Sequence, residues 1–120
     1  MNRKTNISLV LIALIFITAN CTVYLPQSQL KFGVEAAQHG LWDEAIFRWK
    51  KAVEVEPNSA AAHNNLAVAY EAKGLFEKAE IEYRKALQLS PENENIQSNY
   101  QKFKKNINKN EKDGNKDENK

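Results

Sequence analysis

The sequence GLWDEA at residues 40–45 returns as GLFEKA at residues 74–79. Further along, WKKA at residues 49–52 is matched by YRKA at residues 83–86, at the same spacing. A fixed period of about 34 residues is typical of stacked supersecondary units, which bury their apolar faces only against neighbouring units. Such chains usually function through an extended binding surface, so the repeat favours a binding role over a catalytic one.

The local signals inside each repeat predict helices. Gly40 and Gly74 are suited to the C-terminus of the first helix of each pair. Pro57 and Pro91 end the second helix, because proline cannot continue a helix interior. Apolar residues recur at helical spacing and no alternating strand pattern is found. We therefore expect helices at residues 27–39, 43–55, 60–72, 76–89 and 93–107.

These signals predict an all-α fold, a short α-solenoid of two helix–turn–helix repeats at residues 26–59 and 60–93. The last of the five expected helices, whose capping region is residues 94–107, carries one apolar stripe that includes Ile96 and Phe103. We interpret it as the polar capping helix that the end of a solenoid needs for solubility. Residues 108–120 are rich in Lys, Asn, Asp and Glu and are expected to form a disordered tail.

The N-terminus has the pattern of a signal peptide. Arg3 and Lys4 precede an apolar run at residues 7–19, which is short for a membrane-spanning helix. Residues 1–20 are therefore predicted to be a signal peptide, with an uncleaved anchor helix as the alternative. Cys21 follows directly and is the one cysteine of the chain, so an intramolecular disulfide is impossible.

The repeats resemble a known family. The second repeat matches its pattern at Leu66, Ala67, Tyr70, Gly74, Phe76, Ala79, Tyr83, Ala86 and Pro91, and the first at Phe32, Gly33, Gly40, Trp42, Ala45, Trp49, Ala52 and Pro57. This is the pattern of the tetratricopeptide repeat, a helix–turn–helix unit of about 34 residues. The sequence departs from it at Gln29 and His63, where the family usually has an aromatic residue, and at Ala36.

The resemblance implies a binding groove lined by the first helix of each pair. By position, the groove would present Gln27, Leu30, Val34, Ala37, Gln38, Ala61, Asn64, Val68, Glu71 and Ala72. Some family members hold a peptide's terminal carboxylate there with Lys, Asn and Arg, but Leu30 and Val34 occupy two of those places in this chain. We therefore expect the groove to bind an apolar or amide-rich protein segment.

Residues 18–21, Thr-Ala-Asn-Cys, resemble the processing box of bacterial lipoproteins, although Thr18 and Asn20 depart from its preferred residues. The resemblance implies lipidation of Cys21, a short tether at residues 21–25, and membrane attachment in the bacterial cell envelope. Thr22 follows the cysteine in place of the acidic residue that retains some such proteins in the inner membrane, so an outer membrane is favoured if the cell has one. A free cysteine beside an ordinary secretory cleavage site is the alternative.

No pattern indicates catalysis, a metal or a cofactor. His39 and His63 are far apart and lack a second ligand at metal-binding spacing, and no Gly-rich phosphate loop is found. The formal net charge of +2 is too small to indicate nucleic-acid binding. We predict a non-catalytic adaptor or assembly factor that binds another protein. The alternatives are a self-associating structural lipoprotein and an accessory subunit of an envelope enzyme complex.

Overall fold

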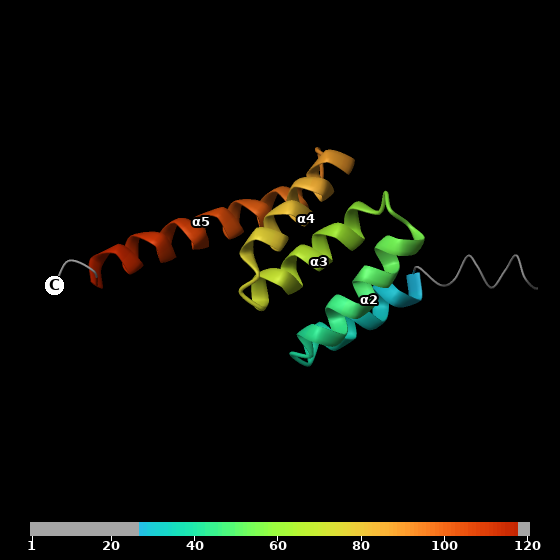
Figure 1. Cartoon of the computed structure of the whole chain (residues 1–120). Coiled ribbons are helices and arrows are strands. Elements are labelled where there is room, and N and C mark those ends of the chain that lie inside the picture. The colour runs from blue at the N-terminus through green and yellow to red at the C-terminus, as the bar shows by residue number, and fades with distance from the viewer. Residues whose placement is uncertain (1–26, 118–120) are drawn as a thin grey trace, which may run out of the picture.

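The structure is a computed structural model that describes the backbone of residues 27–117 and the side chains of residues 27–109. Over this range the chain forms five helices and no strand. Residues 27–38 form the first helix, followed by α2 (Trp42–Val55), α3 (Ala60–Ala72), α4 (Phe76–Leu89) and α5 (Glu94–Asp117). The helices run back and forth, and α2, α3, α4 and α5 each pack against the next (Figure 1). The prediction of an all-α solenoid is confirmed.

The turn inside each repeat is the same hydrogen-bonded helix end. Gly40 has a φ of 72° and Gly74 a φ of 71°, the left-handed conformation that only glycine adopts without strain. Leu41 N–H donates to the carbonyl of Ala36, and Leu75 N–H to that of Tyr70, both at 2.9 Å. These bonds pair helix-end carbonyls that would otherwise lack a partner. The glycines therefore reverse the chain after the first helix of each pair, as predicted.

Close helix crossings in the core depend on small residues. Ala45 and Ala79 are both 0% exposed. Trp49 packs in the first repeat and Tyr83 in the second, and both are almost completely buried. A larger residue at either alanine would push the helices apart. Phe76, whose repeat position also suggests a core role, is instead 37% exposed.

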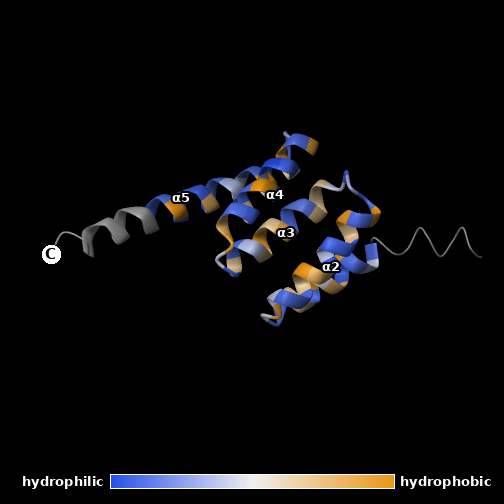
Figure 2. Ribbon diagram, viewed as in Figure 1, coloured by the Kyte–Doolittle hydropathy of each residue, from blue (hydrophilic) through white to orange (hydrophobic). Residues whose placement is uncertain are grey.

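α5 joins the second repeat through a cluster of aromatic rings. Phe103 is 1% exposed, and its ring centroid lies 5.2 Å from that of Tyr83. Ile96 is buried on the same stripe. The rest of α5 is largely polar, as the predominance of blue along its coloured part shows (Figure 2). α5 therefore covers the apolar face of α4, and its remaining surface is polar, as expected of a cap.

The C-terminal boundary differs from its prediction, and the predicted N-terminal features lie outside the structure. The sequence predicts that the cap ends at residue 107, but α5 continues to Asp117. Extending a helix that has already formed needs only one residue fixed per added hydrogen bond, so α5 continues here although residues 108–117 include Gly114 and several Asn and Asp residues, which are poor helix formers. The expected disorder of residues 108–120 is thus wrong up to Asp117. The predicted signal peptide, Cys21 and the tether lie outside the described residues.

Candidate protein-binding groove

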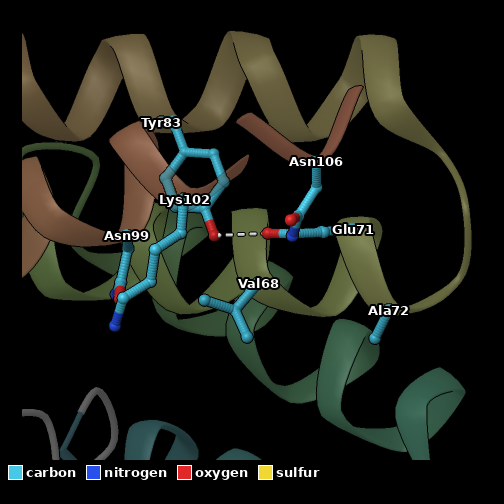
Figure 3. Close-up of a pocket in the computed structure, with 7 residues that line it drawn as sticks. All are labelled: Val68, Glu71, Ala72, Tyr83, Asn99, Lys102 and Asn106. Carbon is cyan, nitrogen blue, oxygen red and sulfur yellow. Dashed lines mark hydrogen bonds between the residues drawn. The ribbon is translucent and has the colours of Figure 1, made fainter. Parts of the chain in front are cut away.

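A pocket of about 340 Å³ opens between α3 and α5, with one side chain of α4 at its base (Figure 3). Three predicted groove residues line it: Val68, Glu71 and Ala72. The other lining residues are Tyr83, Asn99, Lys102 and Asn106. The structure therefore places part of the predicted groove in a real concavity, and it adds a wall from outside the predicted set.

Helical spacing explains why these residues converge. Residues three or four apart lie on one face of a helix, which groups Val68, Glu71 and Ala72 on α3. The same spacing groups Asn99, Lys102 and Asn106 on α5. The buried aromatic stripe of α5 fixes the rotation of that helix, so its polar side chains turn toward α3. Packing in the core thus determines the composition of the groove wall.

Glu71 is held in place by two neutral donors. The phenol of Tyr83 donates to its Oε2 at 2.9 Å, and the side-chain amide of Asn106 donates to its Oε1 at 3.3 Å. Burial, and then the bond to Glu71, raise the pKa of Tyr83 well above its usual value near 10. The phenol therefore remains a donor at physiological pH. These contacts fix a carboxylate at the pocket edge without supplying a positive charge to it.

Amide groups continue the polar wall. Asn99 of α5 donates to the side-chain oxygen of Asn64 of α3 at 3.2 Å. This bond joins the two helices across the groove and places Asn64, another predicted groove residue, next to the pocket lining. Lys102 projects from α5 on the same wall. No described acidic side chain lies within ion-pair distance of Lys102.

The remaining predicted groove residues lie outside this pocket. Leu30 and Ala37 are half-buried and pack against the core of the first repeat. Gln27, Val34, Gln38 and Ala61 are exposed. The prediction that all ten residues form one groove stays a prediction.

The groove predicted from the sequence did not include the lining residues of α5, although the repeat period places two of them there. Lys102 stands one repeat period after Val68, and Asn106 stands one repeat period after Ala72. Extending the repeat register into α5 places both on the groove side. The predicted groove positions of the first two groove helices carry no basic side chain, and the third helix supplies one, Lys102.

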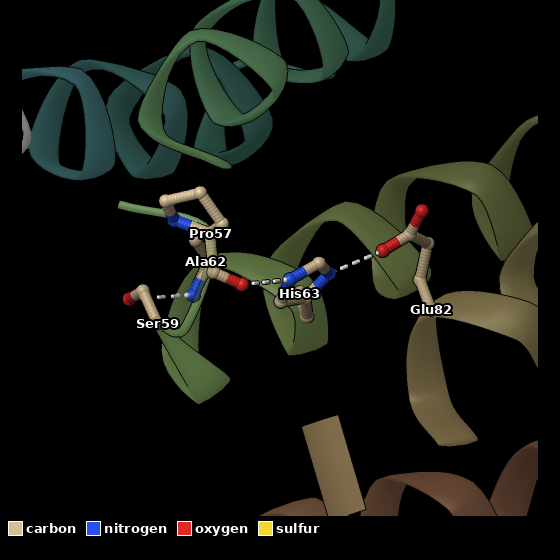
Figure 4. A network of polar contacts seen from close by, with 5 residues as sticks. All are labelled: Pro57, Ser59, Ala62, His63 and Glu82. Carbon is tan, nitrogen blue, oxygen red and sulfur yellow. Dashed lines mark hydrogen bonds and ion pairs between the residues drawn. The ribbon is translucent and has the colours of Figure 1, made fainter. Parts of the chain in front are cut away.

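His63 is buried and serves to join helices (Figure 4). Its Nδ1 lies 2.5 Å from the carboxylate of Glu82 on α4, and its Nε2 lies 2.9 Å from the carbonyl oxygen of Pro57. Both ring nitrogens thus lie within hydrogen-bond distance of an oxygen on another segment. The imidazole fixes α3 against α4 and against the turn after α2. His39, by contrast, is exposed at a helix end.

None of the helices among residues 27–117 is both long enough and apolar enough to cross a bilayer. No three acidic, His or Cys side chains among them converge in a way that would hold a metal ion.

Comparisons with known proteins agree with this geometry. Residues 30–94 match the family model described as tetratricopeptide repeat. The type IV pilus assembly protein PilF of Pseudomonas aeruginosa is 35% identical over 74 residues, which are 62% of this chain and 29% of that protein. A structure solved for the functional characterization of P. aeruginosa PilF matches with a TM-score of 0.69 at 30% identity. That match covers 75% of this chain and 40% of the other, so the chain spans well under half the length of both relatives.

Proposed function

The chain belongs to the tetratricopeptide repeat family, and we propose that it binds a segment of another protein in the groove between α3 and α5. The family supports a protein–protein interaction module as the general role. The observation that supports this particular site is the pocket with an apolar base, an oriented carboxylate and a lysine at its edge. The proposed role is non-catalytic.

The lining determines which segment would fit. Val68, Ala72 and the ring of Tyr83 suit an apolar side chain of the partner. The amides of Asn99 and Asn106 can bind the partner's peptide groups, which are both donors and acceptors. Glu71 and Lys102 add one charge of each sign. A segment with one apolar anchor and flanking polar residues satisfies these groups best.

One pocket is too small to account for useful affinity. Burying one apolar side chain contributes about 1.5–3 kcal/mol. A dissociation constant of about 1 μM requires about 8 kcal/mol. The partner must therefore contact more of the concave side, and the exposed Val34 and Gln38 on the first helix are suited to extend the site.

The cellular setting is part of the proposal. We propose that Cys21 is lipidated and that the chain is attached to a membrane of the bacterial envelope, with an outer membrane favoured. Residues 22–26 separate Cys21 from the first described residue, a span of at most about 20 Å of extended chain. The groove would then act close to the membrane surface. The name of the PilF relative supports a role in assembling an envelope structure such as a pilus.

Site-specific photo-crosslinking tests the groove. We expect benzoylphenylalanine at Val68 to give a discrete product with a partner protein in intact cells. The product should weaken when Lys102→Glu reverses the charge of the groove wall. The matched control is the same photo-crosslinker at Ile81, which is 65% exposed on α4 and does not line the pocket. No product at Val68, or the same product from both positions, would contradict the proposal.

The attachment is tested separately by the intact mass of the chain extracted from its own membrane. A mature chain that begins at Cys21 and carries acyl mass is expected, and a Cys21→Ser variant should lack that mass. An unmodified chain that begins at Met1, or at Cys21, would rule out the lipid anchor. Neither result would change the crosslinking outcome expected at the groove.

A further inference from the structure

α3 and α5 use the same register of residues to pack onto the preceding repeat. In α3 the packing positions are Ala62, Leu66 and Ala69, all at most 3% exposed. The residues one repeat period later in α5 are Ile96, Tyr100 and Phe103. Ile96 and Phe103 are buried, and Tyr100 packs against the second-repeat core. These two helices define the surface that joins one repeat to the next.

In the first helix, residues at two of the corresponding positions are exposed. Phe32 stands one repeat period before Leu66, yet it is 48% exposed whereas Leu66 is 3% exposed. Glu35 takes the place of the buried Ala69 and is exposed. Among residues 27–117 no helix precedes the first one, so nothing in the described chain covers Phe32 as α2 covers Leu66.

A second aromatic ring extends this open surface. The guanidinium of Arg48 lies 5.6 Å from the ring centroid of Phe32 and 5.7 Å from that of Phe47. Phe47 is 51% exposed. Arg48 thus makes cation–π contacts with two half-exposed rings. We call Phe32, Phe47 and Arg48 the N-terminal face.

The charges around this face are balanced. Arg48 pairs with Glu44 at 2.7 Å, and Lys51 pairs with Glu54 at 2.7 Å. On the first helix, Lys31 is followed by Glu35. An anionic membrane would attract an excess of positive charge, which this rim lacks. A two-fold interface requires a surface complementary to itself, and a mixed-sign rim around apolar rings meets that requirement.

The opposite end of the solenoid is different. The free side of α5 exposes polar residues that include Gln101, Lys104 and Lys105. A head-to-tail stack would have to press the N-terminal face against these residues, and repeated stacking would form a filament. When two N-terminal faces pair instead, each copy buries the same surface, and the assembly is complete with two copies.

We propose that the N-terminal face is the contact of a symmetric homodimer, in which the first helices of two copies pack against each other around Phe32 and Phe47. The first helix is about 18 Å long and offers two half-exposed rings per copy, so the contact is smaller than a standard interface. The dimer is therefore concentration-dependent and leaves the α3–α5 groove of each copy open.

The test uses the full chain extracted in mild detergent, with benzoylphenylalanine at Lys31 on the first helix. We expect a product of twice the chain mass, with the crosslink mapped to residues 27–55 of the other copy. The identity of both copies is checked with two differently tagged versions of the chain. The same photo-crosslinker at Lys105 of α5 serves as the positional control and should give no such product.

Matched substitutions assign the contact to the rings. Phe32→Gln should reduce the doubled product at least ten-fold, whereas Ile81→Gln, which removes a similarly exposed apolar side chain from α4, should leave it unchanged. Circular dichroism checks that each variant is folded. Should Phe32→Gln fail to fold, Phe47→Gln provides the same comparison from α2.

Several outcomes would overturn the proposal. A chain that stays monomeric at all concentrations excludes the dimer. Crosslinks from Lys31 to residues 1–26 of its own chain, or only to lipid, would give the face a different occupant. A product of twice the chain mass from the photo-crosslinker at Lys105 would place the contact elsewhere. So would a product from Lys31 whose amount does not change in Phe32→Gln.

Discussion

Gly33 of the first helix faces Trp49 so closely that alanine has no room there. A Cβ added at Gly33 would lie 2.3 Å from Nε1 of Trp49 and 2.6 Å from its Cδ1 and Cε2. Ordinary contacts begin near 3.4 Å, so the ring would have to move by about 1 Å. Trp49 is 3% exposed, and its Nε1 donates to the carbonyl of Leu30 at 3.1 Å. We therefore predict that Gly33→Ala destabilises the chain.

The expected size of the loss follows from three contributions. Overpacking a tight core costs about 1–3 kcal/mol. Weakening the Trp49–Leu30 hydrogen bond costs about 1 kcal/mol more. Replacing glycine by alanine inside a helix returns about 1 kcal/mol. The net loss is about 1–3 kcal/mol, which lowers the melting temperature of a domain this small by at least about 4 °C.

Thermal unfolding followed by circular dichroism measures this change. The control is Gly33→Ala in a Trp49→Phe background, because the smaller phenylalanine ring lacks Nε1, the indole atom nearest to the new Cβ. There the added methyl group should cost much less or be neutral. If Gly33→Ala raises the melting temperature, as helix propensity alone predicts, the packing argument is refuted.

Three further changes test other contacts. Ala79→Leu should cost about 1–3 kcal/mol in thermal unfolding, because Ala79 is 0% exposed at a helix crossing, whereas Ala61→Leu at an exposed site should be nearly neutral. The pKa of Tyr83 is higher in the folded than in the unfolded chain, so deprotonation above pH 10 favours unfolding. The free energy of unfolding should therefore fall more steeply above pH 10 in the parent chain than in Tyr83→Phe. His63→Leu should cost about 1–3 kcal/mol in urea unfolding because it leaves Glu82 and a carbonyl without their partner, while Glu82→Gln, which can still accept, should cost less.

The proposed groove and the proposed dimer use different sides of the first helix and different residues. Val34 and Gln38 belong to the predicted groove, whereas Phe32 and Glu35 belong to the register that packs one repeat onto the next. A dimer of this kind would present two grooves to one assembly. Such pairing strengthens binding to a partner that presents several copies of the bound segment, because the second groove acts at a high effective concentration once the first is occupied.

The sequence alone determined the repeats, the helices and their turns. These features depend on short-range rules: glycine at a left-handed helix end, proline after the second helix, and apolar residues at helical spacing. Gly40 and Gly74 illustrate this, since each has the positive φ expected from its place in the repeat. The C-terminal boundary of α5 was less predictable, because charged residues favour both helix and disorder.

The tertiary structure decided which side chains meet between helices. Glu71 of α3, Tyr83 of α4 and Asn106 of α5 come together only because the aromatic cluster fixes the rotation of α5. By residue type alone, His63 would be expected at the surface and Phe32 in the core, but His63 is buried between helices and Phe32 is exposed at the end of the stack. The reason is physical: local signals determine each helix, whereas burial and polar pairing depend on which helix lies beside it.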